Sequence, residues 1–142
     1  QGECDLVGFG VSAISMIGDA YAQNQKELKK YYDQVNELRH ALWKGVSLDS
    51  DDLLRREVIK QLICNFKLDK KAIESEFKVK FDQYFKEDLQ LLQTFINDEL
   101  VEVDDNEIRV TLRGRLLIRN ICMSFDKYLR AKARQQQFSR VI

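Results

Sequence analysis

Apolar residues in this chain follow a helical period over much of its length. They recur at intervals of three and four residues, which places them on one face of a helix. Asn24 stands where a capping side chain is expected at the start of the first such segment. The pattern predicts four amphipathic helices, over residues 24–43, 50–66, 69–77 and 82–96.

A change of period after these helices indicates a β-hairpin. Residues 99–103 and 107–111 alternate apolar and polar side chains on either side of a turn-forming Asp-Asp-Asn tripeptide. Thr111 then caps a last long helix that extends to about Leu129, and Gly114 allows its backbone to pack closely. Three helices, a hairpin and a closing helix predict a winged-helix-like domain, so we expect a mainly α fold of the α+β class.

The beginning of the chain has a different character. Residues 5–18 are apolar, rich in small side chains and without a period, which predicts a buried strand that leads into a tight loop and cannot fold alone. Residues 43–50 break the helical pattern with a glycine and several turn-forming residues. We therefore expect two domains, 1–45 and 46–142.

Composition is that of an ordinary globular protein. Of 142 residues, 44% are hydrophobic and 32% charged, the formal net charge is zero, and proline is absent, which favours long helices. No apolar run approaches the roughly 18 residues that span a bilayer, so we expect a cytoplasmic protein that does not enter the membrane. The chain opens with Gln1 instead of Met, which suggests a piece excised from a longer protein.

The three cysteines do not form a recognisable ligand set. Cys4, Cys64 and Cys122 are odd in number and far apart, which fits neither a disulfide framework nor a metal knuckle. We interpret them as reduced thiols, and expect Cys64 and Cys122 to pack in the core because apolar residues flank both.

Charge is unevenly distributed along the chain. Residues 113–142 contain eight basic side chains and one acid, a net charge of +7, so the remaining residues carry −7. A basic tail on an acidic body indicates either internal docking or an anionic partner.

One segment matches a phosphate-binding motif. Residues 8–13, Gly-Phe-Gly-Val-Ser-Ala, fit the dinucleotide pattern G-x-G-x-x-A. A helix should begin at such a motif, but the first predicted helix starts near Asn24 and no second strand completes the unit. The glycines are therefore interpreted as a tight strand end, or as a strand-end loop that another ligand can approach closely.

A winged helix also raises the possibility of DNA binding. The third helix, which would enter the major groove, carries five acids and one lysine between residues 82 and 99, a net charge of −4. Such a helix would be repelled by phosphates, so a protein-docking or structural role is favoured over DNA binding. A winged-helix module that binds DNA or protein remains the alternative function.

No catalytic or metal-binding constellation is evident. His40 is the only histidine and has no neighbouring ligand in the sequence. The acidic run 49–52 belongs to a helix start and the run 104–107 to a turn, so neither is a convincing acid–base pair.

Several stretches together resemble one enzyme family. These are residues 8–18, Tyr21-Ala-Gln-Asn-Gln25, Arg55-Arg56, Leu62-Ile-Cys-Asn-Phe66, Gly114-Arg-Leu-Leu-Ile-Arg-Asn-Ile-Cys122 and Gln136-Gln-Phe-Ser-Arg-Val-Ile142. They are similar to the C-terminal part of the oxygen-independent coproporphyrinogen III oxidases (dehydrogenases) of the radical S-adenosylmethionine (SAM) family, and the likeness runs across essentially the whole chain.

The resemblance implies an activity for the parent protein. Family members oxidatively decarboxylate two propionates of coproporphyrinogen III to vinyls, which gives protoporphyrinogen IX in haem biosynthesis. A [4Fe-4S] cluster held by a CxxxCxxC triad cleaves SAM to a radical that abstracts hydrogen from the propionate. No CxxxCxxC occurs here, so the cluster ligands should lie upstream, outside this chain, and the fragment alone should be inactive.

The resemblance also suggests domain roles and a cofactor contact. Residues 1–45 would be the end of the catalytic barrel, one strand plus its helix, and 46–142 the helical C-terminal domain. Ile14 matches the family's apolar SAM contact, and Gly10 and Ser12 would line the same pocket. Coproporphyrinogen III is the expected substrate of a monomeric parent that binds neither nucleic acid nor membrane.

Overall fold

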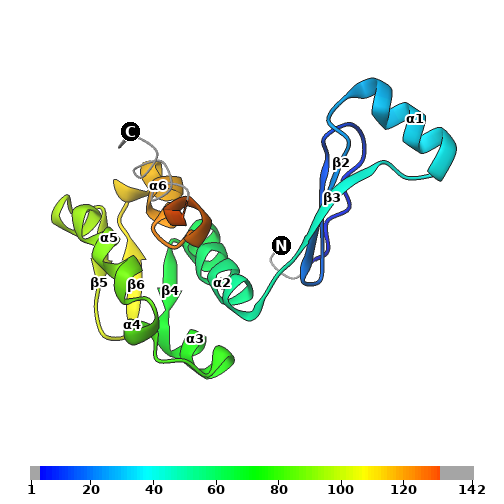
Figure 1. The fold of residues 1–142 in the computed structure, drawn as a ribbon. Helices are drawn as coiled ribbons and strands as arrows, with labels where there is room; N and C mark the ends of the chain where they lie inside the picture. The colour runs from blue at the N-terminus through cyan, green and yellow to red at the C-terminus, as the bar shows by residue number, and fades with distance from the viewer. Residues whose placement is uncertain (1–3, 132–142) are drawn as a thin grey trace, which may run out of the picture. The chain divides into compact units, whose positions relative to one another are not determined.

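The computed structural model describes residues 4–131 and has an α+β fold (Figure 1). The chain divides into two compact units, Gln1–Leu53 and Leu54–Ile142, called here the N-terminal and C-terminal units. In the described part no helix is long and apolar enough to cross a membrane.

The N-terminal unit is a three-stranded antiparallel sheet with one helix. Its strands lie in the order β1-β2-β3, and α1 connects the second strand to the third. The elements are β1 (Ile14–Ile17), β2 (Ala20–Asn24), α1 (Leu28–Leu38) and β3 (Leu42–Ser47). The sequence predicted a single strand here, and the two further strands are a correction to that prediction.

The helix predicted over 24–43 is too long at both ends. Asn24 is the last residue of β2 and does not cap the helix, because its side-chain amide donates to the carbonyl oxygen of Gly10 at 3.0 Å. At the other end, Arg39 has φ 62° and its backbone N–H returns to the Val35 carbonyl, which ends α1. Leu42 then pairs with Asn24 as the first residue of β3.

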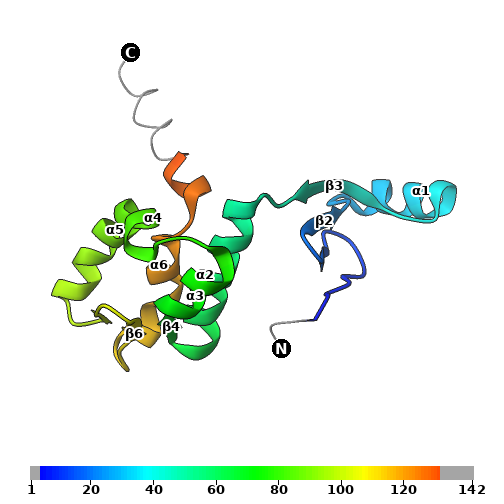
Figure 2. The ribbon, with the colours of Figure 1, turned by 90° about the horizontal axis from the view of Figure 1, so that it is seen from below.

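The C-terminal unit combines a bundle of helices (Figure 2) with a small antiparallel sheet of order β4-β6-β5 (Figure 1). Its elements are α2 (Ser50–Asn65), whose first turn precedes the division between the units, β4 (Lys67–Asp69), α3 (Lys70–Phe77), α4 (Phe81–Tyr84), α5 (Lys86–Asn97), β5 (Val101–Val103), β6 (Glu107–Val110), the 3-10 helix η1 (Gly114–Leu117) and α6 (Ile118–Met123). The order of helices and strands is that of a winged helix, as predicted, with β4 as an unpredicted third strand.

Local signals account for many of these boundaries. Asp69 caps α3 as the sequence indicated, because its carboxylate accepts the Ala72 N–H at 3.0 Å. The register of the predicted hairpin is Val101 opposite Val110 and Val103 opposite Ile108. A Cβ atom at Gly114 would lie 2.0 Å from the Leu100 carbonyl oxygen, so the close packing predicted for this glycine is confirmed.

Two predicted helices are interrupted. The helix predicted over 82–96 is divided into α4 and α5 at Phe85, whose backbone leaves helical geometry while its ring is fully buried. The closing helix ends at Met123, and a new helical turn begins after Asp126. The Asp126 carboxylate accepts the N–H groups of Tyr128 and Leu129, at 2.9 and 3.1 Å, and so acts as an internal cap.

The hydrophobic core belongs to the C-terminal unit. Three phenylalanine rings pack within it, with the centroid of Phe85 at 4.7 Å from that of Phe81 in a tilted pair and 5.5 Å from that of Phe125 in an edge-to-face pair. Its buried members are Leu54, Val58, Leu62, Leu68, Ile73, Phe81, Phe85, Leu92, Val101, Ile108, Val110, Ile121, Cys122 and Phe125. All lie between residues 54 and 125, so this unit can bury its own core.

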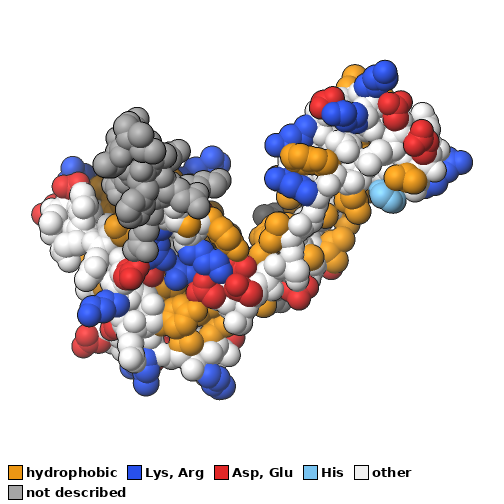
Figure 3. Space-filling model, viewed as in Figure 1, with side chains coloured by type: hydrophobic (Ala, Val, Ile, Leu, Met, Phe, Trp, Pro, Cys, Tyr) orange, Lys and Arg blue, Asp and Glu red, His pale blue; other side chains and the backbone are white. Residues whose placement is uncertain are grey.

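The N-terminal unit has little comparable core. Ala41 is its buried hydrophobic residue among those described, and α1 contains no buried residue. Large apolar side chains are instead exposed on its N-terminal loop, strands and helix (Figure 3). They are Leu6, Val7, Phe9, Ile14, Ile17, Leu28, Tyr32, Leu38, Leu42, Trp43 and Val46.

Candidate functional site

The glycine-rich loop before β1, residues 8–13, is held in a defined shape by hydrogen bonds to residues at the end of β2 and just after it. The Gln23 side chain donates to the Ser12 carbonyl at 3.2 Å, and the Ser12 N–H donates to the Gln25 carbonyl at 2.8 Å. Gly10 and Ser12 have φ of 95° and 60°, which is the left-handed region. The loop is therefore positioned by β2 and not by packing of its own side chains.

The structure brings the three predicted cofactor-binding residues into one short segment. Gly10 and Ser12 lie in the loop, and Ile14 follows as the first residue of β1, with 53% of its surface exposed. Nothing in the described chain lies within 4 Å of a Cβ atom built on Gly10. Gly10 and Ile14 therefore both border open space, which suits the approach of a ligand.

The dinucleotide interpretation fails on the element that follows the motif. The residues after Ala13 form β1, not a helix, so no helix N-terminus faces the loop. Gly8 has a packing reason of its own, because a Cβ atom there would lie 2.6 Å from the Ile14 carbonyl oxygen.

A second cluster, in the C-terminal unit, surrounds the buried carboxylate of Asp88. Its Oδ1 atom accepts Arg55 Nη1 at 2.7 Å and Arg130 Nη2 at 2.9 Å, and Asp88 is only 1% exposed. Arg55 also donates to the Phe125 carbonyl at 3.0 Å and lies over the Phe85 ring. The cluster therefore joins α2, α5 and the turn that begins after Asp126.

An open pocket of ≈ 340 Å³ lies beside this cluster, lined by Arg55, Gln83, Tyr84, Lys86, Glu87, Asp88 and Arg130. The sequence does not indicate this cluster or its pocket, because Asp88 is one of five acids in an apparently solvent-exposed acidic helix. Its ion pairs neutralise that charge, so the outer surface of α5 is less acidic than the sequence implied. The internal docking predicted for the basic tail is seen at Arg130, while residues 132–142 lie outside the description.

The acidic residues 49–52 cap a helix. The Asp49 carboxylate accepts the Asp52 N–H at 2.7 Å, and the Asp52 carboxylate accepts the Asp49 N–H at 3.1 Å. This reciprocal arrangement is a capping box at the start of α2. Asp49, Asp51 and Asp52 bring carboxylate oxygens within 4.8 Å of one another, and the capping contacts explain the positions of Asp49 and Asp52.

The cysteines occupy unlike environments. Cys4 and Cys64 are exposed, so the prediction that Cys64 packs in the core is wrong. It lies in the last turn of α2, on the side away from the core. Cys122 is buried as predicted, and burial raises the pKa of its thiol to about 11, which keeps it protonated near neutral pH.

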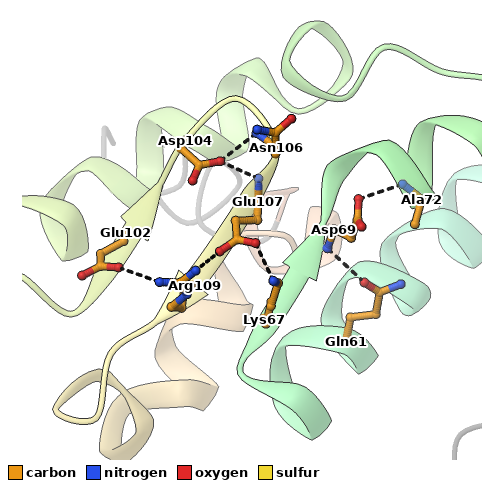
Figure 4. A network of polar contacts seen from close by, with 9 residues as sticks. All are labelled: Gln61, Lys67, Asp69, Ala72, Glu102, Asp104, Asn106, Glu107 and Arg109. Carbon is orange, nitrogen blue, oxygen red and sulfur yellow. Dashed lines mark hydrogen bonds and ion pairs between the residues drawn. The ribbon is translucent and has the colours of Figure 1, made fainter.

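Ion pairs cross the outer face of the C-terminal sheet (Figure 4). Glu107 on β6 contacts Lys67 on β4 at 2.5 Å and also pairs with Arg109, which in turn faces Glu102 on β5 at 3.7 Å. The hydrogen bond from Lys67 lowers the pKa of Glu107. Backbone N–H groups of Asn106 and Glu107 donate to Asp104 and lower the pKa of that carboxyl. These contacts fix strand register and turn, and serve no evident chemistry.

The fold and these sites define a winged-helix-like domain preceded by a sheet that exposes apolar residues and a glycine loop. The HemN C-terminal domain family matches residues 48–117 of the chain. The oxygen-independent coproporphyrinogen III oxidase of Escherichia coli strain K12 is 64% identical over all 142 residues, and that of Pseudomonas aeruginosa is 48% identical over the same length. A Helicobacter pylori relative of the same name is 37% identical over 137 residues, which is 96% of this chain and 29% of the relative.

A solved structure gives the same result. The coproporphyrinogen III oxidase HemN of Escherichia coli, described as a radical SAM enzyme, superimposes with a TM-score of 0.85 at 62% identity over 90% of this chain and 30% of its own. The chain therefore contains a HemN C-terminal domain, and over its whole length it is similar to part of the oxygen-independent coproporphyrinogen III oxidases. It spans 31% of the length of the Escherichia coli and Pseudomonas relatives.

Proposed function

We propose that this chain is a region of an oxygen-independent coproporphyrinogen III oxidase. The whole enzyme would oxidatively decarboxylate two propionates of coproporphyrinogen III to vinyls and yield protoporphyrinogen IX in haem biosynthesis. The observation that carries the proposal is the 64% identity to the Escherichia coli enzyme over the entire chain. We also propose that the enzyme acts in the cytoplasm as a monomer and binds no nucleic acid.

The two units would have different tasks in this enzyme. Residues 1–45 would complete the catalytic barrel, and 46–142 would form the C-terminal domain. Support for the first assignment comes from the exposed apolar residues of the N-terminal unit, because isolated domains rarely leave so many uncovered. The second is supported by the family match to residues 48–117 and by the self-contained core of the C-terminal unit.

The N-terminal unit would contribute one wall of the SAM site. Ile14 would pack against the cofactor, while Gly10 and Ser12 would line the same pocket with backbone atoms. The exposed Ile14 side chain and the open space beside Gly10 fit this role. SAM, when bound, supplies the radical chemistry, and the task of these residues is to hold it in place and exclude water.

The [4Fe-4S] cluster would be held by residues outside this chain. Two of the three cysteines are exposed on different units and the third is buried with a raised pKa, so they do not fit a cluster site. The chain by itself would therefore be inactive.

A complementation experiment tests the proposal. The full-length gene that encodes this chain is expressed in an anaerobic bacterial strain deleted for its own coproporphyrinogen III oxidases. Under conditions in which growth requires haem, we expect the full-length gene to restore growth without added haem. The 142-residue chain alone should not restore it. A full-length protein that accumulates in soluble, cluster-loaded form without restoring growth would refute the assignment.

A further inference from the structure

The surface of the C-terminal unit carries an exposed stripe of apolar and cationic side chains that is not part of the hydrophobic core. The stripe consists of Leu112, in the turn before η1, Leu116 of η1, and Arg119 and Met123 of α6, which recur at intervals of four, three and four residues. Leu112 is 78% exposed and Leu116 is 89% exposed, and Arg119 and Met123 are also exposed.

The opposite side of the same segment packs the core. Ile121 and Cys122 are buried, the Cys122 thiol lies 4.0 Å from the Ile59 carbonyl oxygen of α2, and Gly114 lies against Leu100. The stripe therefore faces away from the core and is not one of its members. Leucines this exposed on an ordered helical segment are characteristic of a contact surface.

The charge of the segment indicates the chemistry of its partner. Residues 112–125 contain three arginines and no acid. Arg113 reaches Glu99 only at 4.0 Å, and Arg115 lies over the Phe66 ring at 4.4 Å. Within residues 4–131, neither Arg115 nor Arg119 forms an ion pair. A partner that complements this surface must offer carboxylates beside apolar groups.

We propose that the stripe docks on a carboxylate-bearing apolar surface in the part of the same polypeptide that lies outside this chain. The proposal rests on the proposed function, because the relatives that match over this whole chain are about three times its length. Small molecules bind in concave sites, whereas these leucines project from the surface, which favours a protein surface over a soluble ligand.

Zero-length cross-linking in the full-length protein tests this docking. The substitution Arg119→Lys keeps the cation and introduces an amine, which a carbodiimide couples only to a carboxylate in direct contact. Peptide mass spectrometry then locates the linked acid. The native pair Lys67–Glu107, in contact at 2.5 Å, reports that the reagent works in the same sample.

We expect the linked carboxylate to lie outside residues 1–142. Leu116→Asp in the Arg119→Lys background should reduce the yield of this link at least about fivefold, while Leu91→Asp, at a 46% exposed leucine of α5, should leave it unchanged. The Lys67–Glu107 yield should be constant in all variants, which shows that the C-terminal unit remains folded.

Several results would overturn the docking. The link could be absent while the Lys67–Glu107 link forms, could join residues within this chain, or could join two protein copies, as mixed isotope labelling would reveal. Competition of the link by added coproporphyrinogen would instead identify a ligand site. Since the cross-link does not depend on turnover, an inactive protein that gives the expected link refutes the proposed function alone.

Discussion

At the residue scale, the buried carboxylate of Asp88 is the centre of an ion-pair cluster in the C-terminal unit. Two arginines from different elements share its Oδ1 atom, and it is almost fully buried. A buried ion pair contributes little net stability, but removal of one partner leaves an uncompensated charge. The consequence is a large asymmetry between breaking this cluster and breaking a surface pair.

Asp88→Asn should lower the free energy of unfolding by about 3 kcal/mol, measured by urea denaturation of the 142-residue chain. Glu99→Gln is the matched control, because Glu99 forms an exposed pair with Arg113 at 4.0 Å and its loss should cost less than about 0.5 kcal/mol. Equal effects of the two substitutions would show that Asp88 has no special role.

Ile14 is the residue proposed to contact SAM, and Ile17 is a matched control for its substitution. Both belong to β1 and both are 53% exposed, but only Ile14 adjoins the glycine loop. In the full-length protein, Ile14→Asp should weaken SAM binding at least about tenfold, because a charge would replace an apolar contact. Equilibrium binding of SAM should change less than twofold for Ile17→Asp, and an unchanged affinity in folded Ile14→Asp protein would remove Ile14 from the site.

At the scale of elements, the turn between β5 and β6 depends on the ionised form of Asp104. Hydrogen bonds from the Asn106 and Glu107 N–H groups lower the pKa of this carboxyl in the folded state. A lowered folded-state pKa stabilises the hairpin above the pKa of the unfolded chain, and this stabilisation is lost as the pH falls through the folded-state pKa.

Asp104→Asn should therefore lower the urea midpoint at pH 7, and the difference from the unmodified chain should shrink below about pH 4. The neighbouring substitution Asp105→Asn should have little effect at either pH, because the exposed Asp105 makes no such contacts. A difference between the Asp104→Asn variant and the parent that is independent of pH would contradict this account.

Elements with a local signal could be predicted from the sequence, and elements defined by distant contacts could not. Asp69 indicates the start of α3 and the Asp-Asp-Asn turn indicates the hairpin, because in both cases an aspartate accepts hydrogen bonds from N–H groups two or three residues later. Strand β3 gave no such signal, because all its residues are exposed and its pairing partner lies about 20 residues earlier. Phe85 interrupts a helical pattern because its ring fills the core between Phe81 and Phe125.

The candidate sites follow the same division. Gly10, Ser12 and Ile14 could be identified because they are close in sequence and resemble a family motif. The Asp88 cluster could not, because Arg55 and Arg130 are separated from it by 33 and 42 residues and the sequence shows Asp88 only as one acid among several.

At the scale of the whole molecule, the two units should differ in their ability to fold alone. Residues 50–142 contain the entire core cluster and should unfold cooperatively as an isolated fragment. Residues 1–49 expose most of their large apolar side chains and should lack a cooperative transition. Circular dichroism during thermal unfolding distinguishes the two, and a cooperative transition in 1–49 would contradict the view that this unit is completed by other residues.

We propose that the chain belongs to an enzyme that acts on coproporphyrinogen III. The most direct measurement uses the full-length protein, purified and loaded with its iron–sulfur cluster without oxygen, and supplied with SAM and a reductant. We expect 5′-deoxyadenosine to form only when coproporphyrinogen III is added, and protoporphyrinogen IX to appear with it. Cleavage of SAM without consumption of the porphyrinogen, or no cleavage in protein with an intact cluster, would contradict it.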